Sequence, residues 1–169
     1  MKLRISIILT AVVLLFSCRG DEENVQAIDQ VLMLYVRSAT NNQDLLNSKI
    51  DGSYSTVALL DQLDETTANK PITGYSLLKD ADTVVYMDYA AGAVRELKDS
   101  ISPELKTYRS RFIIRYSKTV NSQTVNDDDI IEIEYNWTPS LFQISKLWYD
   151  NELKFTKVPG QRNVVQIVK

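Results

Sequence analysis

The sequence predicts a single α+β domain, in which N-terminal helices pack on one face of an antiparallel β-meander of about four to five strands. Two observations lead to this fold class. Before Pro103 the apolar residues recur mostly at helical spacing, and after it they alternate as in a strand. The 169 residues are 44% hydrophobic and 24% charged, which is the balance of an ordinary globular chain. We therefore expect one core without a second domain.

The first predicted helix covers residues 23–39. Its apolar positions at helical spacing are Val25, Ile28, Val31, Leu32, Tyr35 and Ala39. A short helical piece is expected around Leu45 and Leu46, and a second full helix over residues 55–65. The segment 66–73, with Pro71, is predicted as a loop.

Residues 82–101 allow two interpretations. Thr83 to Tyr86 have the β-branched and aromatic character of a strand. Over the longer segment, however, one helical face collects Tyr86, Met87, Ala90, Ala93, Val94, Leu97 and Ile101. The longer pattern favours a helix that Asp82 caps and Ser102-Pro103 ends, and the strand alternative stays open.

The predicted sheet follows Pro103. Its strands cover residues 108–116, 131–137, 142–149, 153–158 and 164–168. Polar turns are expected over residues 121–129, 138–140, 150–152 and 159–160. In the first strand Arg109, Arg111 and Arg115 share one face, while Phe112 and Tyr116 lie on the other.

The N-terminal segment has the features of an export signal. Lys2 and Arg4 precede the apolar run 5–16, which is shorter than the roughly 20 residues that cross a bilayer. Leu15-Phe16-Ser17-Cys18 resembles the lipobox of bacterial lipoproteins. The resemblance implies that residues 1–17 are a removable signal peptide and that Cys18 carries the lipid. The alternative is an ordinary secretion signal that happens to contain a cysteine.

Residues 18–24 then form a lipidated, acidic tether, and residues 25–169 form the domain. Position 19, directly after the cysteine, is arginine. It therefore does not resemble the inner-membrane retention signal of proteobacterial lipoproteins, which has aspartate there, and we expect an outer-membrane location. Asp21-Glu22-Glu23 is similar to the surface-export signal of Bacteroidota lipoproteins, and a solvated spacer is the alternative. Whether the domain faces the periplasm or the cell surface stays open.

Composition excludes several kinds of chemistry. The chain has no histidine, and Cys18 is its single cysteine, so imidazole catalysis, thiol pairs and zinc sites are not expected. The five glycines are too scattered to form a phosphate-binding loop. A net charge of −3 argues against nucleic acid as a partner. We expect no cofactor, no metal and no enzymatic activity.

Two acidic groups are candidate sites. Glu132 and Glu134 share a strand face and could act as the paired carboxylates of a hydrolase, but pairing with the arginine row is the simpler interpretation. The run 126–129, with three aspartates, could gather a hard cation, although a solvated turn is favoured.

The leading functional hypothesis is a membrane-anchored lipoprotein that binds another envelope or surface protein, as an accessory part of a secretion or transport assembly. The predicted partner-binding residues are Arg109, Arg111, Arg115, Trp148 and Tyr149. The final strand is a second candidate surface. Two alternatives remain: a small-ligand domain with a cone-like pocket, resembling nuclear-transport-factor or cystatin architectures, and the carboxylate hydrolase.

Overall fold

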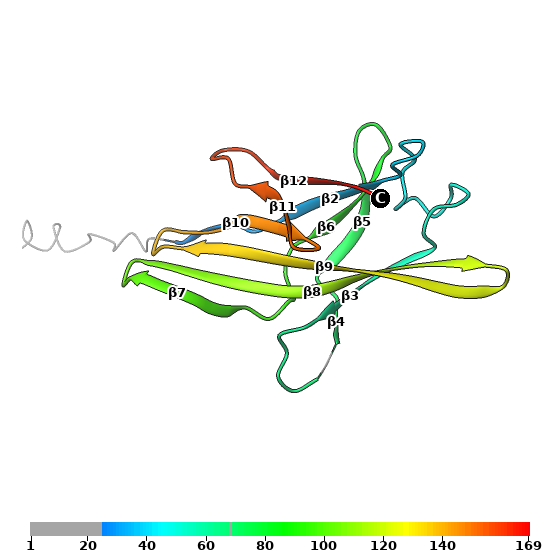
Figure 1. Ribbon diagram of the computed structural model, residues 1–169. Helices are drawn as coiled ribbons and strands as arrows, with labels where there is room; N and C mark the ends of the chain where they lie inside the picture. Colours follow the sequence, from blue (N-terminus) through cyan, green and yellow to red (C-terminus); the bar gives the residue numbers. More distant parts are fainter. Residues whose placement is uncertain (1–24, 68) are drawn as a thin grey trace, which may run out of the picture.

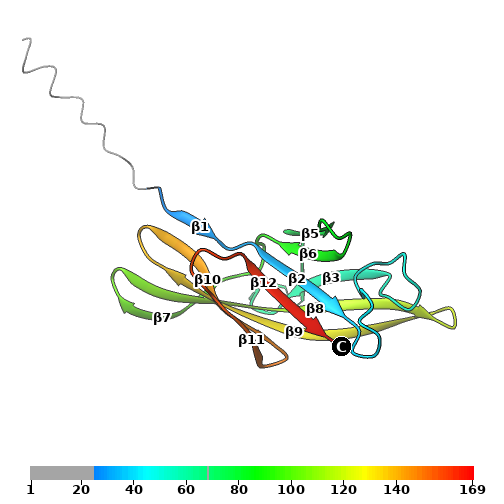
Figure 2. The ribbon, with the colours of Figure 1, turned by 90° about the horizontal axis from the view of Figure 1, so that it is seen from above.

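The computed structural model describes residues 25–67 and 69–169, and within these ranges the protein is all-β. Strands make up 60% of it and helices 0%. The strands form two sheets, the larger of which curls into a half-barrel. Figure 2 shows β2 and β12 of the small sheet running obliquely over the long strands β8 and β9 of the large one.

The large sheet has eight strands, in the order β1-β10-β9-β8-β3-β4, with β7 paired to β8 and β11 paired to β10. β1 is parallel to β10, and the other pairings are antiparallel. The bounds are β1 Ala27–Asp29, β3 Thr56–Asp61, β4 Lys70–Ile72, β7 Glu96–Ser102, β8 Leu105–Val120, β9 Gln123–Trp137, β10 Leu141–Tyr149 and β11 Glu152–Thr156.

The small sheet has four strands, in the order β12-β2-β6-β5. Its strands are β2 Leu32–Arg37, β5 Tyr75–Lys79, β6 Val85–Tyr89 and β12 Asn163–Val168. β12 runs parallel to β2, and the other two pairings are antiparallel. The last strand of the described chain, β12, pairs with β2 alone and lies at an edge of the small sheet.

The core lies between the facing sides of the two sheets. Tyr89 of β6 and Phe112 of β8 meet across it, with ring centroids 5.2 Å apart. Alternate residues of each strand supply the remaining contacts. The small sheet contributes Leu32, Leu34, Val36, Met87, Tyr89, Val165 and Ile167, and the large sheet Leu59, Phe112, Ile114, Tyr116, Ile131, Ile133, Tyr135, Ile144 and Leu147. The opposite side of each sheet has no helix over it in the described chain.

The long β8–β9 hairpin projects beyond the other strands (Figure 1). Asn121 and Ser122 turn it with φ of 48° and 63°, and Asp150 and Asn151 turn β10 into β11 with φ of 48° and 67°. Positive φ at both central residues is the geometry that matches the twist of paired strands. The sequence placed the second turn correctly. The first turn was predicted over residues 121–129, which is too long, because residues 123–129 already belong to β9.

The α+β prediction is wrong, because every predicted helix is replaced by strands or turns. Of the predicted helix 23–39, the described residues 25–39 contain β1 and β2 instead of a helix. In β2 the buried residues are Leu32, Leu34 and Val36, at a spacing of two. Leu34 and Val36 lie off the predicted helical stripe, and a strand between two layers accounts for the burial of both.

The shorter helices are absent for local reasons. Around Leu45 and Leu46 the Asp44 carboxylate accepts a hydrogen bond from the backbone N–H of Leu46 at 3.1 Å, which favours a turn. Its other oxygen accepts from the N–H of Val85 at 2.8 Å. Residues 55–65 contain β3, which ends where the Asp61 side chain accepts from the N–H of Leu63 at 2.7 Å.

Residues 82–101 form two strands, so the alternative based on strand propensity was the correct one. Val85, Met87 and Tyr89 of β6 are buried alternately. Gly92, with φ of +122°, and the close approach of Gly74 to the backbone of Ala91 then turn the chain toward β7. The predicted strands after Pro103 correspond to β8 to β12, but β8 is longer at both ends and β9 begins at Gln123 instead of residue 131.

Candidate functional site

The predicted arginine row lies on the outer face of the large sheet, and each of its members has a carboxylate partner. Arg111 contacts Glu132 at 3.3 Å, as cross-strand pairing predicted. Arg115 forms a two-pronged contact with Asp128 at 2.7 and 2.6 Å. Arg109 pairs with Glu96 of β7. The row is thus neutralised within the sheet and offers little free positive charge to a partner.

The two strand glutamates are also engaged. Glu134 contacts Lys98 at 2.5 Å and Lys146 at 3.7 Å. Burial alone would raise the pKa of Glu134, but the bond from Lys98 and the charges around it outweigh that effect and lower the pKa. A general acid needs the opposite shift. These contacts give no support to the hydrolase alternative.

The two predicted aromatic residues lie on opposite faces of β10. Trp148 is partly exposed on the outer face, with Lys98 Nζ 5.5 Å from its ring centroid. Tyr149 is buried on the inner face, where its hydroxyl lies 3.1 Å from that of Tyr116. Four of the five residues predicted as one surface therefore lie on the outer side of the sheet, and the fifth, Tyr149, lies in the core.

Tyr149 belongs to a buried polar cluster that the sequence analysis did not identify. We use the name tyrosine cluster for Tyr54, Tyr116, Tyr149, Asp127, Asp129 and Lys169. Lys169 Nζ contacts Asp127 at 2.8 Å and also contacts Asp129. Tyr54 donates to Asp127 at 2.8 Å, and Tyr149 donates to Asp129. The rings of Tyr54 and Tyr116 stack with centroids 4.7 Å apart.

The hydroxyls of this cluster are held in their protonated form. Burial, and then the Asp127 carboxylate, raise the pKa of Tyr54. Burial raises the pKa of Tyr116, and burial with the Tyr116 and Asp129 neighbours raises that of Tyr149. At neutral pH these tyrosines are hydrogen-bond donors, so the cluster lacks a phenolate nucleophile or base.

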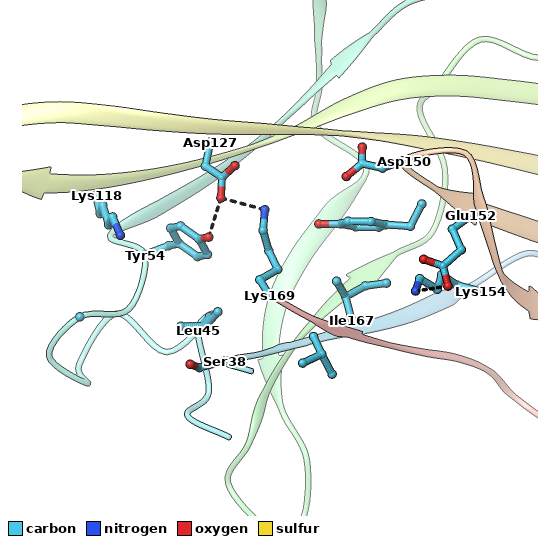
Figure 3. Close-up of a pocket in the computed structure, with 13 residues that line it drawn as sticks. Ser38, Leu45, Tyr54, Lys118, Asp127, Asp150, Glu152, Lys154, Ile167 and Lys169 are labelled. Carbon is cyan, nitrogen blue, oxygen red and sulfur yellow. Dashed lines mark hydrogen bonds and ion pairs between the residues drawn. The ribbon is translucent and has the colours of Figure 1, made fainter. Parts of the chain in front are cut away.

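A cavity of about 680 Å³ opens beside the tyrosine cluster (Figure 3). Its charged lining residues are Lys118, Asp127, Asp150, Glu152, Lys154 and Lys169. Figure 3 shows Lys169 and Tyr54 converging on Asp127, while Lys154 is paired with Glu152 at 2.7 Å. The cavity is polar and carries both signs of charge.

The outer face of the small sheet carries a different surface, which we name the aromatic patch: Met33, Tyr35, Leu78, Tyr86 and Val164. The rings of Tyr35 and Tyr86 lie 5.4 Å apart. Met33 is the register partner of Val164, and Leu78 that of Tyr86, so the five side chains are contiguous across four strands. A hollow of about 260 Å³ continues the patch at Met33 and Tyr86 and contains Arg162.

The edge strand β5 borders this patch, and its only charged residue is Lys79 at its end. Leu77 and Leu78 are 41% and 43% exposed. By contrast, the edge strand β7 has two register shifts, and β4 has three residues including Pro71. Bulges, short length and proline discourage pairing with another chain, and β5 has none of them.

Cys18 and the predicted tether lie outside the described residues. Across 25–67 and 69–169, no helix is long and apolar enough to cross a membrane. The same part of the chain contains no group of three or more acidic, histidine or cysteine side chains arranged to hold a metal ion. In the run 126–129, Asp128 faces Arg115 while Asp127 and Asp129 face Lys169.

Most functional residues of these sites come from distant parts of the sequence. Tyr54, Asp127 and Lys169 come from three separate segments of the chain, and no local sequence motif indicates that they contact one another. The alternation of Tyr116 with Arg115 and Ser117 was the available signal that Tyr116 points inward, and Tyr149, which follows Trp148, has no such signal. Comparison of the chain with protein-family models, with curated proteins and with solved structures finds no significant match.

Proposed function

We propose that this protein is a membrane-anchored, non-enzymatic lipoprotein that binds another envelope or surface protein. Cys18 in a lipobox-like sequence supports the anchor. Two acyl chains are enough for stable attachment, because each buried methylene contributes about 0.8 kcal/mol. The tether of residues 19–24 would keep the domain within about 20 Å of the bilayer. The partner is then a protein of the same membrane or of its surface.

The observation that carries the binding proposal is the uncovered aromatic patch next to an open strand edge. Tyrosine and methionine are enriched in protein interfaces because they combine large contact area with adaptable packing. An open edge adds backbone hydrogen bonds to an extended segment, and side chains on the neighbouring face select its sequence. In the described chain the patch and β5 adjoin through Leu78 and Tyr86. We expect the partner to add a strand at β5.

Site-specific photo-crosslinking in the producing cells tests this surface. A photoreactive residue replaces Leu78, and a matched control replaces Val125, which is 45% exposed in β9. We expect one discrete crosslinked protein from position 78 and none from position 125. The double variant Tyr35→Ser/Tyr86→Ser should remove that product while circular dichroism still reports a folded domain. Equal products from both positions, or none from 78, would contradict the proposed surface.

The cavity beside the tyrosine cluster favours a second candidate function, binding of a small polar ligand. Its volume of about 680 Å³ lies in the range of known ligand sites, and its charges suit a zwitterion. Free amino acids at millimolar concentration are a suitable probe. A rise in melting temperature that disappears in Lys154→Met would support this candidate, since Lys154 is a lining residue outside the buried cluster.

A further inference from the structure

Arg95 is a basic residue for which the described chain supplies no carboxylate partner. It lies between β6 and β7, and its guanidinium carbon is 4.9 Å from the ring centroids of both Tyr135 and Phe142. One of its nitrogens donates to Gln30 Oε1 at 2.8 Å. Its Nε is buried and has no hydrogen-bond partner. A guanidinium has five N–H donors, so most of the bonding capacity of Arg95 is unused.

Lys106 has a similar environment nearby. Its Nζ lies 5.0 Å from the ring centroid of Trp137, which is also its register partner, and no ion pair of the described residues includes it. The arginine row behaves differently, since Arg109, Arg111 and Arg115 are all paired with carboxylates. Two cations on aromatic rings without acidic partners therefore stand out in an acidic chain.

One ring from each group, Phe142 and Trp137, borders a cavity of about 350 Å³, and Lys106 itself lies outside its lining. Its lining includes Arg95, Tyr108, Trp137 and Phe142, together with Gln30 and Ile28. An anionic group could accept hydrogen bonds from Arg95 here, and the apolar remainder of the same ligand could contact the rings and Ile28. Arginine suits such a role because its planar fork binds phosphate or carboxylate with two parallel bonds.

The position of the cavity identifies the source of the anion. β1 carries Ile28 and is the first strand of the described chain, and the β7–β8 and β9–β10 turns lie at the same end of the molecule (Figure 1). Aliphatic side chains are exposed at this end: Ile28 is 62%, Ile101 61% and Leu97 54% exposed. Tryptophan and tyrosine with aliphatic neighbours are typical of surfaces at the lipid–water boundary.

We propose that this cavity binds the phosphate of an anionic phospholipid headgroup, with Arg95 as the phosphate ligand and with Lys106, on the Trp137 ring outside the lining, as a nearby positive charge. The proposal rests on the proposed anchoring, since a tether at Cys18 would bring the β1 end to the bilayer. The exposed aliphatic residues would then contact the acyl region while Trp137 lies at its boundary. Binding would fix the orientation of the domain and direct the aromatic patch toward its partner.

The test uses Trp137 as a reporter in the full-length protein in non-ionic detergent. A Trp148→Phe background leaves Trp137 as the single tryptophan, because the chain has two. The probe is dihexanoyl phosphatidylglycerol below its critical micelle concentration, compared with glycerol 1-phosphate and with dihexanoyl glycerol. We expect a saturable change in Trp137 emission with the phospholipid. Arg95→Gln should weaken apparent binding about tenfold or more, as expected for a charged hydrogen-bonding group.

The control variant is Arg162→Gln, which removes the same charge in the hollow of the small sheet and should leave binding unchanged. Equal affinity for glycerol 1-phosphate would overturn the lipid assignment in favour of a soluble phosphate compound. Equal affinity for dihexanoyl glycerol, or identical titrations for Arg95→Gln and the parent protein, would overturn the phosphate site. None of these results depends on the crosslinking at Leu78, so the two proposals fail separately.

Discussion

Replacement of Lys169 by methionine should destabilise the domain strongly, because this lysine is the cation of the tyrosine cluster. Its side chain is 17% exposed, and the Asp129 side chain that it contacts is 9% exposed. Methionine keeps much of the length and the apolar stem but leaves two carboxylates without their counter-ion. Removing one partner of a buried ion pair costs about 3–5 kcal/mol.

We expect the lower end of that range, about 3 kcal/mol, because the Asp127 side chain is 46% exposed and water will solvate part of its charge. For a chain of this length, each kcal/mol lowers the melting temperature by about 2–4 °C, so the expected decrease is about 6–12 °C. The matched control is Lys154→Met, whose partner Glu152 is 72% exposed. It should cost less than about 1 kcal/mol.

The assay is thermal and urea unfolding followed by circular dichroism between pH 3 and pH 8. Burial raises the pKa of Asp127, but hydrogen bonds from Lys169 and Tyr54 outweigh burial and lower it. Because the folded pKa lies below the unfolded value, this group stabilises the domain above pH of about 4, and the stabilisation is lost as the pH falls through the folded pKa. The loss in free energy of unfolding caused by Lys169→Met should therefore become smaller toward pH 3. A deficit below about 1 kcal/mol at pH 7, similar to that of Lys154→Met, would refute the reasoning.

Three further predictions concern other parts of the molecule. Gly74→Ala should lower the free energy of unfolding in urea by about 2–4 kcal/mol, because the added Cβ would lie 1.9 Å from the carbonyl oxygen of Ala91. The control Gly160→Ala should lower it less, despite a φ of +76° at Gly160, because no atom lies within 4 Å of the added Cβ. Arg111→Gln should change the melting temperature little, since its pair with Glu132 is partly exposed, and a large loss would show that the pair is stronger than a surface ion pair. Cys18→Ser should move the protein from the membrane to the soluble fraction with an unchanged melting temperature, and a variant that stays in the membrane would contradict the lipid anchor.

The sequence was informative where one face of a strand is charged and the other apolar. In β8 and β9 the arginine and glutamate residues alternate with Phe112, Ile114, Ile131 and Ile133, so the period of two and the pairing of the arginine row with the glutamates could be predicted, whereas the register could not. The N-terminal half gave no such contrast. β2 reads Leu-Met-Leu-Tyr-Val-Arg, and its outer face is apolar too, so the period of two was hidden.

The sites were harder to predict than the strands. Tyr149 was placed beside Trp148 on one surface, yet adjacent strand residues face opposite sides, and the inner side was the one with the aspartates. The aromatic patch joins residues of four strands whose order depends on the parallel pairing of β2 with β12. That pairing forms between the two ends of the domain, and local patterns carry no information about it.

The same parallel pairing sets an order for folding. Asn163 donates hydrogen bonds to the carbonyl of Val31, 132 residues away, and to Asp29. Closing so long a loop is costly in chain entropy, so chains dominated by such pairings fold slowly. The local β8–β9 hairpin can form early, whereas the small sheet is completed only when residues 163–168 join it as β12. β2 therefore keeps one of its two edges unpaired until residues 163–168 are available to it.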